Sequence, residues 1–481
     1  MRFVVSLLAL GACDGDAAEP ESTIDTRVDQ TSEGSTVESV TPRMCMGDEG
    51  HVFVAWEDPR DDMHGIWFNA SADGGTSWFP ADIKLNTGDA HATSPDVACA
   101  GDFVYVFWED ERDGELKNHN IYANVSENAG RDWLYEDIRL DGDEEGEAMS
   151  IGPRAFATGD KAYVAWFDNR NGAYDIYVNH TTDGGGNWQR TASRVDTDEA
   201  GEAYSAWPQI AADTDGNVSV VWEDSRDGAN DIYYNVSEDH GNNFGAADVR
   251  LDEGDDAGSA DSFFPQIAVS GNHVYAVWHD ERDGEQRDIL FNASDDGGND
   301  WMNEAVRVES DAAGQSDSLN PSISAAEDSV NIVWQDDRSG GYDVYHRYSD
   351  DGGDNWVGDE RRMDTDAGGE SHSFDPVVSV SGSTVLVGWQ DRRDDLGGDS
   401  FDDLYYNYSQ DGGASWSEAD LRINSNAPGS AYAVDLNLGR SGKNLVAVWA
   451  DGRFGSSDIF CASRGVGEES VYVPPKKKTE K

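Results

Sequence analysis

The sequence predicts an all-β protein, an eight-bladed β-propeller of four-stranded antiparallel blades. One motif, Trp-x-Asp-x-Arg, occurs eight times at intervals of 52 to 60 residues, strand-like segments flank every copy, and each repeating unit has room for four strands. Four-stranded sheets repeated at this period are typical of propeller blades. The copies begin at Trp56, Trp108, Trp166, Trp222, Trp278, Trp334, Trp389 and Trp449.

Each unit contains the same succession of predicted strands. A first strand opens with proline, as in 208–211, and a second alternates β-branched and aromatic residues up to the motif's tryptophan, as in 274–278. A third strand follows an Asp/Gly-rich turn, as in 231–235, and a short fourth strand comes later, as in 249–251. Alternation rich in Val, Tyr and Trp indicates half-buried strands, and Asp/Gly clusters indicate turns.

A second motif, Ser/Thr-x-Asp-x-Gly-x-x-Trp, follows the third strand in seven of the eight units. Asn128 replaces its Asp in the second unit, and Phe244 replaces its Trp in the fourth. The carboxylate can accept main-chain N–H groups across a tight turn, and glycine supplies the positive φ that the turn needs. We therefore expect a structural role for the aspartates of this motif, Asp73, Asp183, Asp239, Asp296, Asp351 and Asp411.

The eighth unit, residues 434–463, lacks the second motif and a fourth strand. Residues 26–29, Thr-Arg-Val-Asp, match the fourth-strand pattern at the other end of the sequence. We predict that this amino-terminal strand completes the last blade, because a closed ring has no open sheet edge. The propeller then spans residues 25–465, and residues 466–481 form a disordered Pro/Lys tail.

The amino terminus resembles a prokaryotic lipoprotein signal. A charged start and a short apolar run end in Leu-Gly-Ala before Cys13, which is typical of an export signal. We expect residues 1–12 to be removed, Cys13 to carry the lipid, residues 13–24 to form an acidic tether, and the protein to act outside the cytoplasm at the cell surface. A simple cleaved signal is the alternative. Three cysteines remain, Cys45, Cys99 and Cys461, so at least one stays unpaired within the chain and the pairing is left open.

The chain carries 96 acidic and 34 basic side chains, a formal net charge of −62. Such a chain repels phosphate backbones and anionic lipids, so we exclude nucleic-acid partners and expect membrane contact only through the lipid anchor. A monomer without a cofactor is expected. Calcium is left as an alternative at three acidic loops that resemble half of a calcium loop but lack its final Glu, residues 141–146, 196–198 and 364–366.

The second motif resembles the Asp-box of the sialidase-like (BNR) propellers, and the resemblance covers residues 25–465. It implies the propeller fold and a carbohydrate-related role. The sialidases of this family have six blades and an Arg-Ile-Pro motif, whereas this sequence has eight units and only the reversed pairs at 42–43 and 153–154. No catalytic residue can be carried over. We expect binding of an acidic glycan through one loop face, with a sialidase-like hydrolase or lyase, or a scaffold that binds protein or cations, as alternatives.

Departures from the repeat indicate where a ligand would bind. The spacing after the tryptophan is irregular in units two, five and seven, whose arginines are Arg112, Arg282 and Arg393. Guanidinium groups can bind carboxylates in a bidentate manner, and exposed aromatic rings suit sugar faces. The candidate ligand-binding residues are Arg112, Arg282, Arg393, Trp207, Phe264 and Tyr432. The alternative is structural: each arginine pairs with the Asp of its own motif, and the aromatic rings pack between blades.

Overall fold

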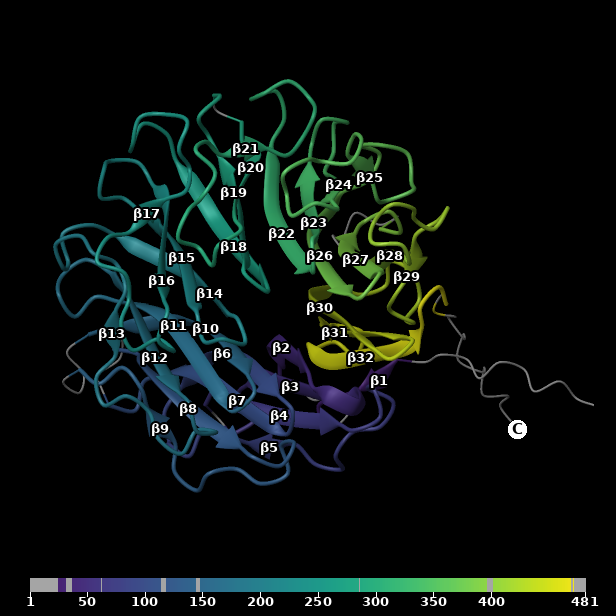
Figure 1. The fold of residues 1–481 in the computed structure, drawn as a ribbon. Coiled ribbons are helices and arrows are strands. Elements are labelled where there is room, and N and C mark those ends of the chain that lie inside the picture. Colours follow the sequence, from purple (N-terminus) through teal and green to yellow (C-terminus); the bar gives the residue numbers. More distant parts are fainter. Residues whose placement is uncertain are drawn as a thin grey trace, which may run out of the picture.

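The computed structural model describes residues 25–31, 37–61, 63–113, 118–143, 148–284, 286–395, 401–468 and 470. The predicted signal, Cys13, the tether and residues 471–481 lie outside these described residues. Within them, the chain forms eight four-stranded antiparallel sheets arranged as a ring, which confirms the predicted fold class (Figure 1). The one helical element described is a 3-10 turn, η1 (Asp48–Gly50). No helix among the described residues is long and apolar enough to cross a bilayer.

Each blade is built from four consecutive strands, blade 1 from β2–β5 and so on around the ring, and blade 8 from β30–β32 with β1. The first, inner strands are β2 (Val40–Met46), β6 (Ala92–Ala100), β10 (Ser150–Thr158), β14 (Ser205–Ala212), β18 (Ser262–Ser270), β22 (Ser318–Ala326), β26 (Ser373–Ser381) and β30 (Ala433–Ser441). The second strands are β3 (Val52–Asp58), β7 (Phe103–Asp110), β11 (Lys161–Asp168), β15 (Val218–Asp224), β19 (His273–Asp280), β23 (Ser329–Asp336), β27 (Thr384–Asp391) and β31 (Asn444–Asp451).

The outer half of each blade holds a long third strand and a two-residue fourth strand. The third strands are β4 (Gly65–Ser71), β8 (Asn120–Ser126), β12 (Asp175–Thr181), β16 (Asp231–Ser237), β20 (Asp288–Ser294), β24 (Asp343–Ser349), β28 (Asp403–Ser409) and β32 (Asp458–Gly465). The fourth are β5 (Ile83–Lys84), β9 (Ile138–Arg139), β13 (Ser193–Arg194), β17 (Val249–Arg250), β21 (Val306–Arg307), β25 (Arg361–Arg362), β29 (Leu421–Arg422) and β1 (Thr26–Arg27).

The ring closes as the sequence predicts. Strand β1 pairs antiparallel with β32, and Thr26 lies opposite Cys461. The main-chain N–H of Val28 then donates to the carbonyl of Ile459 at 2.7 Å. In Figure 1 the first coloured strand therefore lies beside the last one. The outer edge of blade 8 is covered by the start of the chain, and the ladder groups of β32 are satisfied.

The core lies between adjacent blades rather than within any one of them. All eight motif tryptophans are fully buried. Trp108 of blade 2 packs with Phe53 and Phe68 of blade 1, and Trp56 of blade 1 packs with Val446 and Val448 of blade 8. Large aromatic faces dominate the apolar area that these contacts remove from water. Each repeat therefore needs its neighbour to complete its core.

The turns of the second motif are held by their own side chains. Asp73 Oδ1 accepts the main-chain N–H of Ser77 at 2.8 Å and the hydroxyl of Ser71 at 2.8 Å, and Trp78 Nε1 donates to the carbonyl of Gly75 at 3.2 Å. The carboxylates at the other five predicted positions accept a main-chain N–H four residues later in the same way. These hydrogen bonds stabilise the turns, so the six carboxylates have a structural role.

A disulfide joins Cys45 of β2 to Cys99 of β6, with Cα atoms 6.0 Å apart, and so links the inner strands of blades 1 and 2. Cys461 is a buried free thiol. At the other end of the chain, residues 466–468 and 470, within the segment predicted as a tail, contact blade 7. Tyr406 Oη donates to the carbonyl of Glu468 at 2.9 Å, and Ser470 Oγ donates to that of Asn424 at 2.8 Å.

Candidate functional site

A ring of eight residues surrounds one mouth of the central channel, at the start of the inner strands. Each blade has a register irregularity there, and the residue just before the Pro (Leu436 in blade 8) adopts a positive φ. A positive φ is unusual for bulky residues, yet Trp207 has φ 54° and Phe264 has φ 52°; such strain is often found at functional sites. This mouth ring comprises Thr41, Ser94, Gly152, Trp207, Phe264, Asn320, Asp375 and Asp435.

In blades 2, 4 and 6 the residue between Trp and Asp of the first motif accepts a main-chain N–H of the mouth ring from the next blade. Glu109 Oε1 accepts the N–H of Gly152 at 2.9 Å, and Glu223 Oε1 accepts that of Phe264 at 2.7 Å. Blade 3 has Phe167 at this position. Its ring lies 5.4 Å from that of Trp207. This single exchange of a polar group for an aromatic ring makes the mouth locally apolar.

A cavity of about 330 Å³ opens at this mouth beside blades 1 to 4. It contains two guanidinium groups, one carboxylate, one imidazole and an indole, among the lining residues Thr41, Arg43, Ser94, Pro95, Glu109, His119, Met149, Ile151, Gly152, Arg154, Phe167 and Trp207. A second cavity, also about 330 Å³, shares both arginines and is otherwise lined by Asp96, Ala155, Gln209, Ile210 and Gln266. The arginines are therefore common to the mouth cavity and this channel cavity.

Arg43 and Arg154 are half-buried, and no described carboxylate forms an ion pair with either. Among the described residues, each donates a hydrogen bond only to the carbonyl of the proline before it, at 3.5 Å and 3.1 Å respectively. Asp96 uses its two oxygens to accept the N–H groups of Val97 and Ala155. Burial lowers the pKa of Arg154, although Asp96 acts in the opposite direction. A half-buried guanidinium with no described carboxylate at ion-pair distance can bind an external anion.

His119 adds a third basic group to the mouth cavity. Its Nδ1 lies 3.1 Å from Glu109 Oε2, and its Nε2 lies 3.5 Å from Glu111 Oε1. The close contact with Glu109 and the nearby carboxylates raise the pKa of His119 against the opposing effect of burial. A raised pKa favours the protonated imidazole, which donates hydrogen bonds.

An exposed aromatic surface continues from the mouth cavity toward blade 5. The side chains of Trp207 and Phe264 are 43% and 49% exposed, and their ring centroids lie 6.3 Å apart. Phe264 in turn lies 5.3 Å from His279. Large apolar side chains are rarely left exposed next to one another without a function.

The structure places the predicted site residues in two groups. Trp207 and Phe264 lie together at the mouth. Arg112, Arg282 and Arg393 do not line either cavity, and each binds the Asp of its own motif. Arg112 and Arg393 also bind acids near the fourth strand of their blade, each at 2.7 Å. Tyr432, in blade 8, is likewise outside both cavities. The prediction that these four residues bind ligand stays untested, but the contacts of the arginines favour the structural alternative.

Sequence reasoning missed Arg43, Arg154, Glu109 and His119. One signal could have found the arginines. Blades 1 and 3 have Arg directly after the proline of the first strand. The other blades have acidic, polar or apolar residues at this position, which are Asp96, Gln209, Gln266, Ser322, Val377 and, after Leu436, Asn437. Arginine at this register is therefore not required by the repeat, unlike arginine in the first motif.

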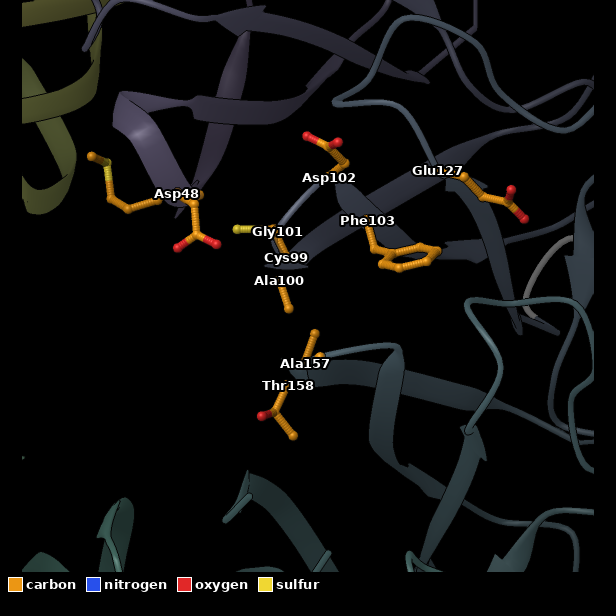
Figure 2. A pocket seen from close by; sticks show the side chains of 12 residues that line it. Asp48, Cys99, Ala100, Gly101, Asp102, Phe103, Glu127, Ala157 and Thr158 are labelled. Atoms are coloured by element: carbon orange, nitrogen blue, oxygen red, sulfur yellow. The ribbon is translucent and has the colours of Figure 1, made fainter. Parts of the chain in front are cut away.

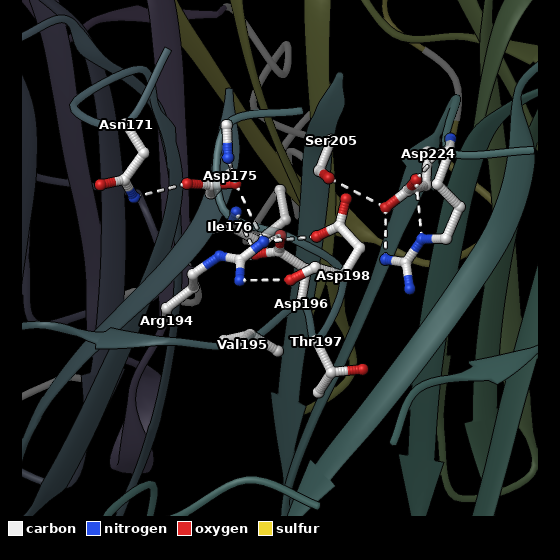
Figure 3. Close-up of polar contacts among 12 residues, drawn as sticks. Asn171, Asp175, Ile176, Arg194, Val195, Asp196, Thr197, Asp198, Ser205 and Asp224 are labelled. Atoms are coloured by element: carbon white, nitrogen blue, oxygen red, sulfur yellow. Dashed lines mark hydrogen bonds and ion pairs between the residues drawn. The ribbon is translucent and has the colours of Figure 1, made fainter. Parts of the chain in front are cut away.

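The acidic loops that resemble calcium loops are paired with arginines of the fourth strands. Arg194 lies among Asp175, Asp196 and Asp198 and forms ion pairs with all three (Figure 3). Burial and the contact with Asp198 raise the pKa of Asp196 to about 8. From the sequence, either an arginine or a calcium ion could neutralise these acids. In this blade the guanidinium of Arg194 does so.

The opposite end of the channel has a different chemical character. A cavity of about 650 Å³ is bordered there by Asp48, Asp102 and Glu127, beside Phe103 and the disulfide sulfur of Cys99 (Figure 2). Its described lining contains no basic side chain. An acidic ligand therefore suits the mouth that holds the arginines, not this one.

No protein-family model and no curated protein matches the chain. Among solved structures, it is similar to the polysaccharide lyase Uly1, with 9% identity, a TM-score of 0.50, and coverage of 81% of this chain and 94% of the lyase. It is also similar to an α-L-arabinanase of Penicillium chrysogenum complexed with arabinobiose (15% identity, TM-score 0.40, 66% of this chain and 94% of that one) and to a Hadza microbial sialidase (14%, 0.37, 62% and 63%).

The chain is a β-propeller and shares its fold with the polysaccharide lyase Uly1. The resemblance read from the repeated motifs is thus confirmed for the fold. At these low identities the similarity does not extend to residues of a site, so the chemistry of the mouth has to be argued from this chain alone.

Proposed function

We propose that this protein binds an acidic saccharide at the mouth of its channel, beside blades 1 to 5. One observation carries the proposal: Arg43 and Arg154, two guanidinium groups without a described ion pair, share a cavity with the exposed indole of Trp207. An anionic substituent of the ligand would lie at the guanidinium groups, and a sugar ring would lie on the indole face. Charge-assisted hydrogen bonds and aromatic contact supply affinity and orientation together.

The overall charge makes this local positive site significant. A chain with net charge −62 repels an anion at long range, so binding depends on short-range contacts inside the cavity. Added salt screens the long-range repulsion over about 10 Å at 0.1 M. Association of an acidic saccharide is therefore expected to become faster as moderate salt is added, the reverse of the usual behaviour of oppositely charged partners.

Binding is favoured over hydrolysis because the lining of the mouth cavity has a single described carboxylate. A glycoside hydrolase of the usual kind needs two carboxyl groups on either side of the scissile bond. Among the described residues that line the mouth cavity, Glu109 is the only carboxylate, and it already binds the N–H of Gly152 and lies beside His119. A scaffold role, the other alternative, does not require a cavity at this position.

We also propose that the protein works outside the cytoplasm, anchored through a lipid on Cys13. The disulfide between Cys45 and Cys99 supports this location, because disulfides persist mainly in oxidising compartments. The similarity to Uly1, a polysaccharide lyase, supports the class of ligand.

Calorimetric titration of the full-length protein with matched acidic and neutral oligosaccharides tests the proposal. The acidic ligand should bind, and Arg154→Gln and Arg43→Gln should each weaken it at least tenfold, as expected for loss of a charged hydrogen bond. These substitutions copy Gln209 and Gln266 at the same register, so the fold should be retained.

Trp207→Ala should weaken both ligands if the indole contacts the sugar ring. Equal affinity for acidic and neutral ligands, or unchanged affinity in the arginine variants, would refute the proposal. Release of shorter saccharides during the titration would favour the enzymatic alternative.

A further inference from the structure

Among the described residues, three blades contain a trio of acidic residues where the third strand begins and the fourth strand ends. Each acid trio comprises the first residue of the third strand and two acids that follow the fourth strand. One carboxylate oxygen of each member lies within 4.8 Å of the others. The trios are Asp175, Asp196 and Asp198 in blade 3, Asp288, Glu309 and Asp311 in blade 5, and Asp343, Asp364 and Asp366 in blade 6.

The trio of blade 3 is fully paired. Arg194 lies 3.0 Å from Asp175 Oδ1 and 2.5 Å from Asp196 Oδ2, and it also binds Asp198 (Figure 3). The second oxygen of Asp175 accepts a hydrogen bond from Asn171 at 2.7 Å. Protein donors therefore contact all three carboxylates, and no further ligand is required in this blade.

The trio of blade 6 is not satisfied in this way. Arg362 binds Asp364 and Asp366 at 2.9 Å each but lies 3.9 Å from Asp343. Asp343 is 1% exposed, and its Oδ2 has no hydrogen-bond partner among the described residues. The blade 6 counterpart of Asn171 is Ser339, whose hydroxyl lies 3.5 Å from Tyr345 Oη.

Blade 5 shows the same deficit at a different oxygen. Glu309 is 4% exposed, and its Oε2 has no partner in the part of the chain that the structure describes. Arg307 lies 3.7 Å from Glu309 and binds Asp288 at 2.9 Å. A buried carboxylate oxygen without a partner is costly, because it loses its hydration and gains nothing in return.

Other blades show what normally occupies this place. In blade 7 the corresponding residues are Asn424 and Asn426, and Asn424 Nδ2 donates to Asp403 at 2.6 Å and to Asn426 at 2.5 Å. In blade 8 the hydroxyl of Thr31 donates to Asp29 at 2.8 Å. Neutral donors stand at these positions in blades 7 and 8, whereas blades 5 and 6 have acids there, and no described donor reaches Asp343 Oδ2 or Glu309 Oε2.

We propose that the acid trios of blades 5 and 6 each bind a divalent cation, Ca²⁺. Each trio has three carboxylates against one guanidinium, as in blade 3, but of the three trios only those of blades 5 and 6 also have a buried carboxylate oxygen without a partner among the described residues, and a divalent ion would bind that oxygen. Ca²⁺ binds oxygen ligands at about 2.3–2.6 Å, so two oxygens on one ion can be up to about 5 Å apart, as the trios require. Mg²⁺ demands a tighter octahedral shell and gives up its water reluctantly, so these buried clusters favour Ca²⁺.

Equilibrium dialysis of the full-length, chelator-stripped protein against CaCl₂ tests this proposal. About 1 M NaCl in the buffer reduces the screening length to about 3 Å and so suppresses loose binding to the acidic surface. Two tightly bound Ca²⁺ per chain are expected. The paired substitution Asp364→Asn with Asp366→Asn should remove one, and Glu309→Gln with Asp311→Asn should remove the other.

The matched control is Asp196→Asn with Asp198→Asn in blade 3, which should leave the bound calcium unchanged. Blade 7 already contains Asn at both places, so the substitutions are compatible with the blade. As a second measurement, the blade 6 variant should melt at a higher temperature than the unsubstituted protein in chelator, since it removes like charges, and should gain less from Ca²⁺. No bound calcium, or equal loss in the blade 3 control, would overturn the proposal.

Discussion

Thr26 and Cys461 lie opposite each other in neighbouring antiparallel strands, although they stand near the two ends of the propeller sequence. This pairing places Asp25 and Asp29 in the last blade. Asp25 lies 2.9 Å from Arg453, and Asp29 accepts the N–H of Ile459 at 3.0 Å. The first residues of the propeller therefore satisfy the buried N–H of Ile459 and add a second carboxylate to Arg453, which also binds Asp451.

Deleting residues 1–30 should destabilise the whole propeller. The deletion removes β1 and leaves the guanidinium of Arg453 without its Asp25 partner. Arg453 keeps its pairing with Asp451, so the loss comes mainly from the exposed edge of β32 and from the buried N–H of Ile459, which loses its acceptor Asp29 at a cost of about 1–3 kcal/mol for this group alone. Urea unfolding should show the decrease, while a protein lacking only residues 1–24 should unfold like the full chain. Identical unfolding of the two truncated proteins would mean that closure by β1 contributes nothing.

The fold could be predicted because every blade repeats the same local signals. Trp108, for example, stands in a run of β-branched and aromatic residues that indicates a strand, which the structure buries on both faces, and Asp110 and Arg112 form the turn after it. Each such signal is weak alone, but few folds are compatible with eight copies at a regular interval. The closing strand was predictable for the same reason: Thr26 to Asp29 match a pattern that is missing from the eighth unit.

The candidate site was predicted only in part, because the most visible arginines are the ones that the fold uses. Arg282 is repeated in register and binds Asp280 in the structure. Arg154 can be recognised in the sequence only because most other blades have a different residue after the first-strand proline. Its position in the channel depends on the irregularity before each inner strand, and no local pattern in the sequence reveals that a positive φ turns the chain there.

Glu223 should make stability depend on pH. Burial raises the pKa of its carboxyl group to about 7, whereas an unfolded chain has about 4.3. Between these values the folded protein holds a proton that the unfolded chain releases, so the free energy of unfolding falls as pH rises. The contribution is fully present below about 4.3 and is lost as pH rises through about 7. Glu223→Gln should remove this part of the slope.

The substitution is conservative because Gln335 already accepts the N–H of Asp375 in the equivalent place of blade 6, at 2.9 Å. Urea unfolding of both proteins at several pH values supplies the comparison. Other acids also titrate in this range, so the informative quantity is the difference in unfolding free energy between the two proteins. A difference that stays constant from about pH 4.3 to 7 would show that Glu223 titrates normally.

Cys13→Ser should release the protein from membranes. Lipidation requires the thiol of Cys13, and two or more acyl chains are needed for stable anchoring. Fractionation of cells that express each form should place the unsubstituted protein with the membranes and the variant in the soluble fraction. Cys461→Ser is the control, because the thiol of Cys461 is buried in blade 8 and cannot carry a lipid. A variant that still partitions with membranes would rule out this anchor.

Arg282→Ala should reduce stability and leave saccharide affinity unchanged. Arg282 binds both oxygens of Asp280, at 2.8 and 2.7 Å, and Asp280 is 1% exposed. Removing the guanidinium leaves a buried carboxylate without its main partner, which typically costs about 3–5 kcal/mol. Arg112→Ala and Arg393→Ala should behave in the same way. Urea unfolding measures the first effect and calorimetric titration the second.

The opposite pattern is expected for Arg154→Gln. Arg154 has no described ion pair to lose, and its pKa is lowered by burial, so removing the charge should cost little stability or even increase it. The same change removes a contact to the anionic group of the ligand. The two arginine classes are thus separated by two measurements on the same variants. If Arg282→Ala instead kept its stability and lost affinity, the arginines of the repeated motif would be the ligand-binding set, and the mouth cavity would not be the binding site.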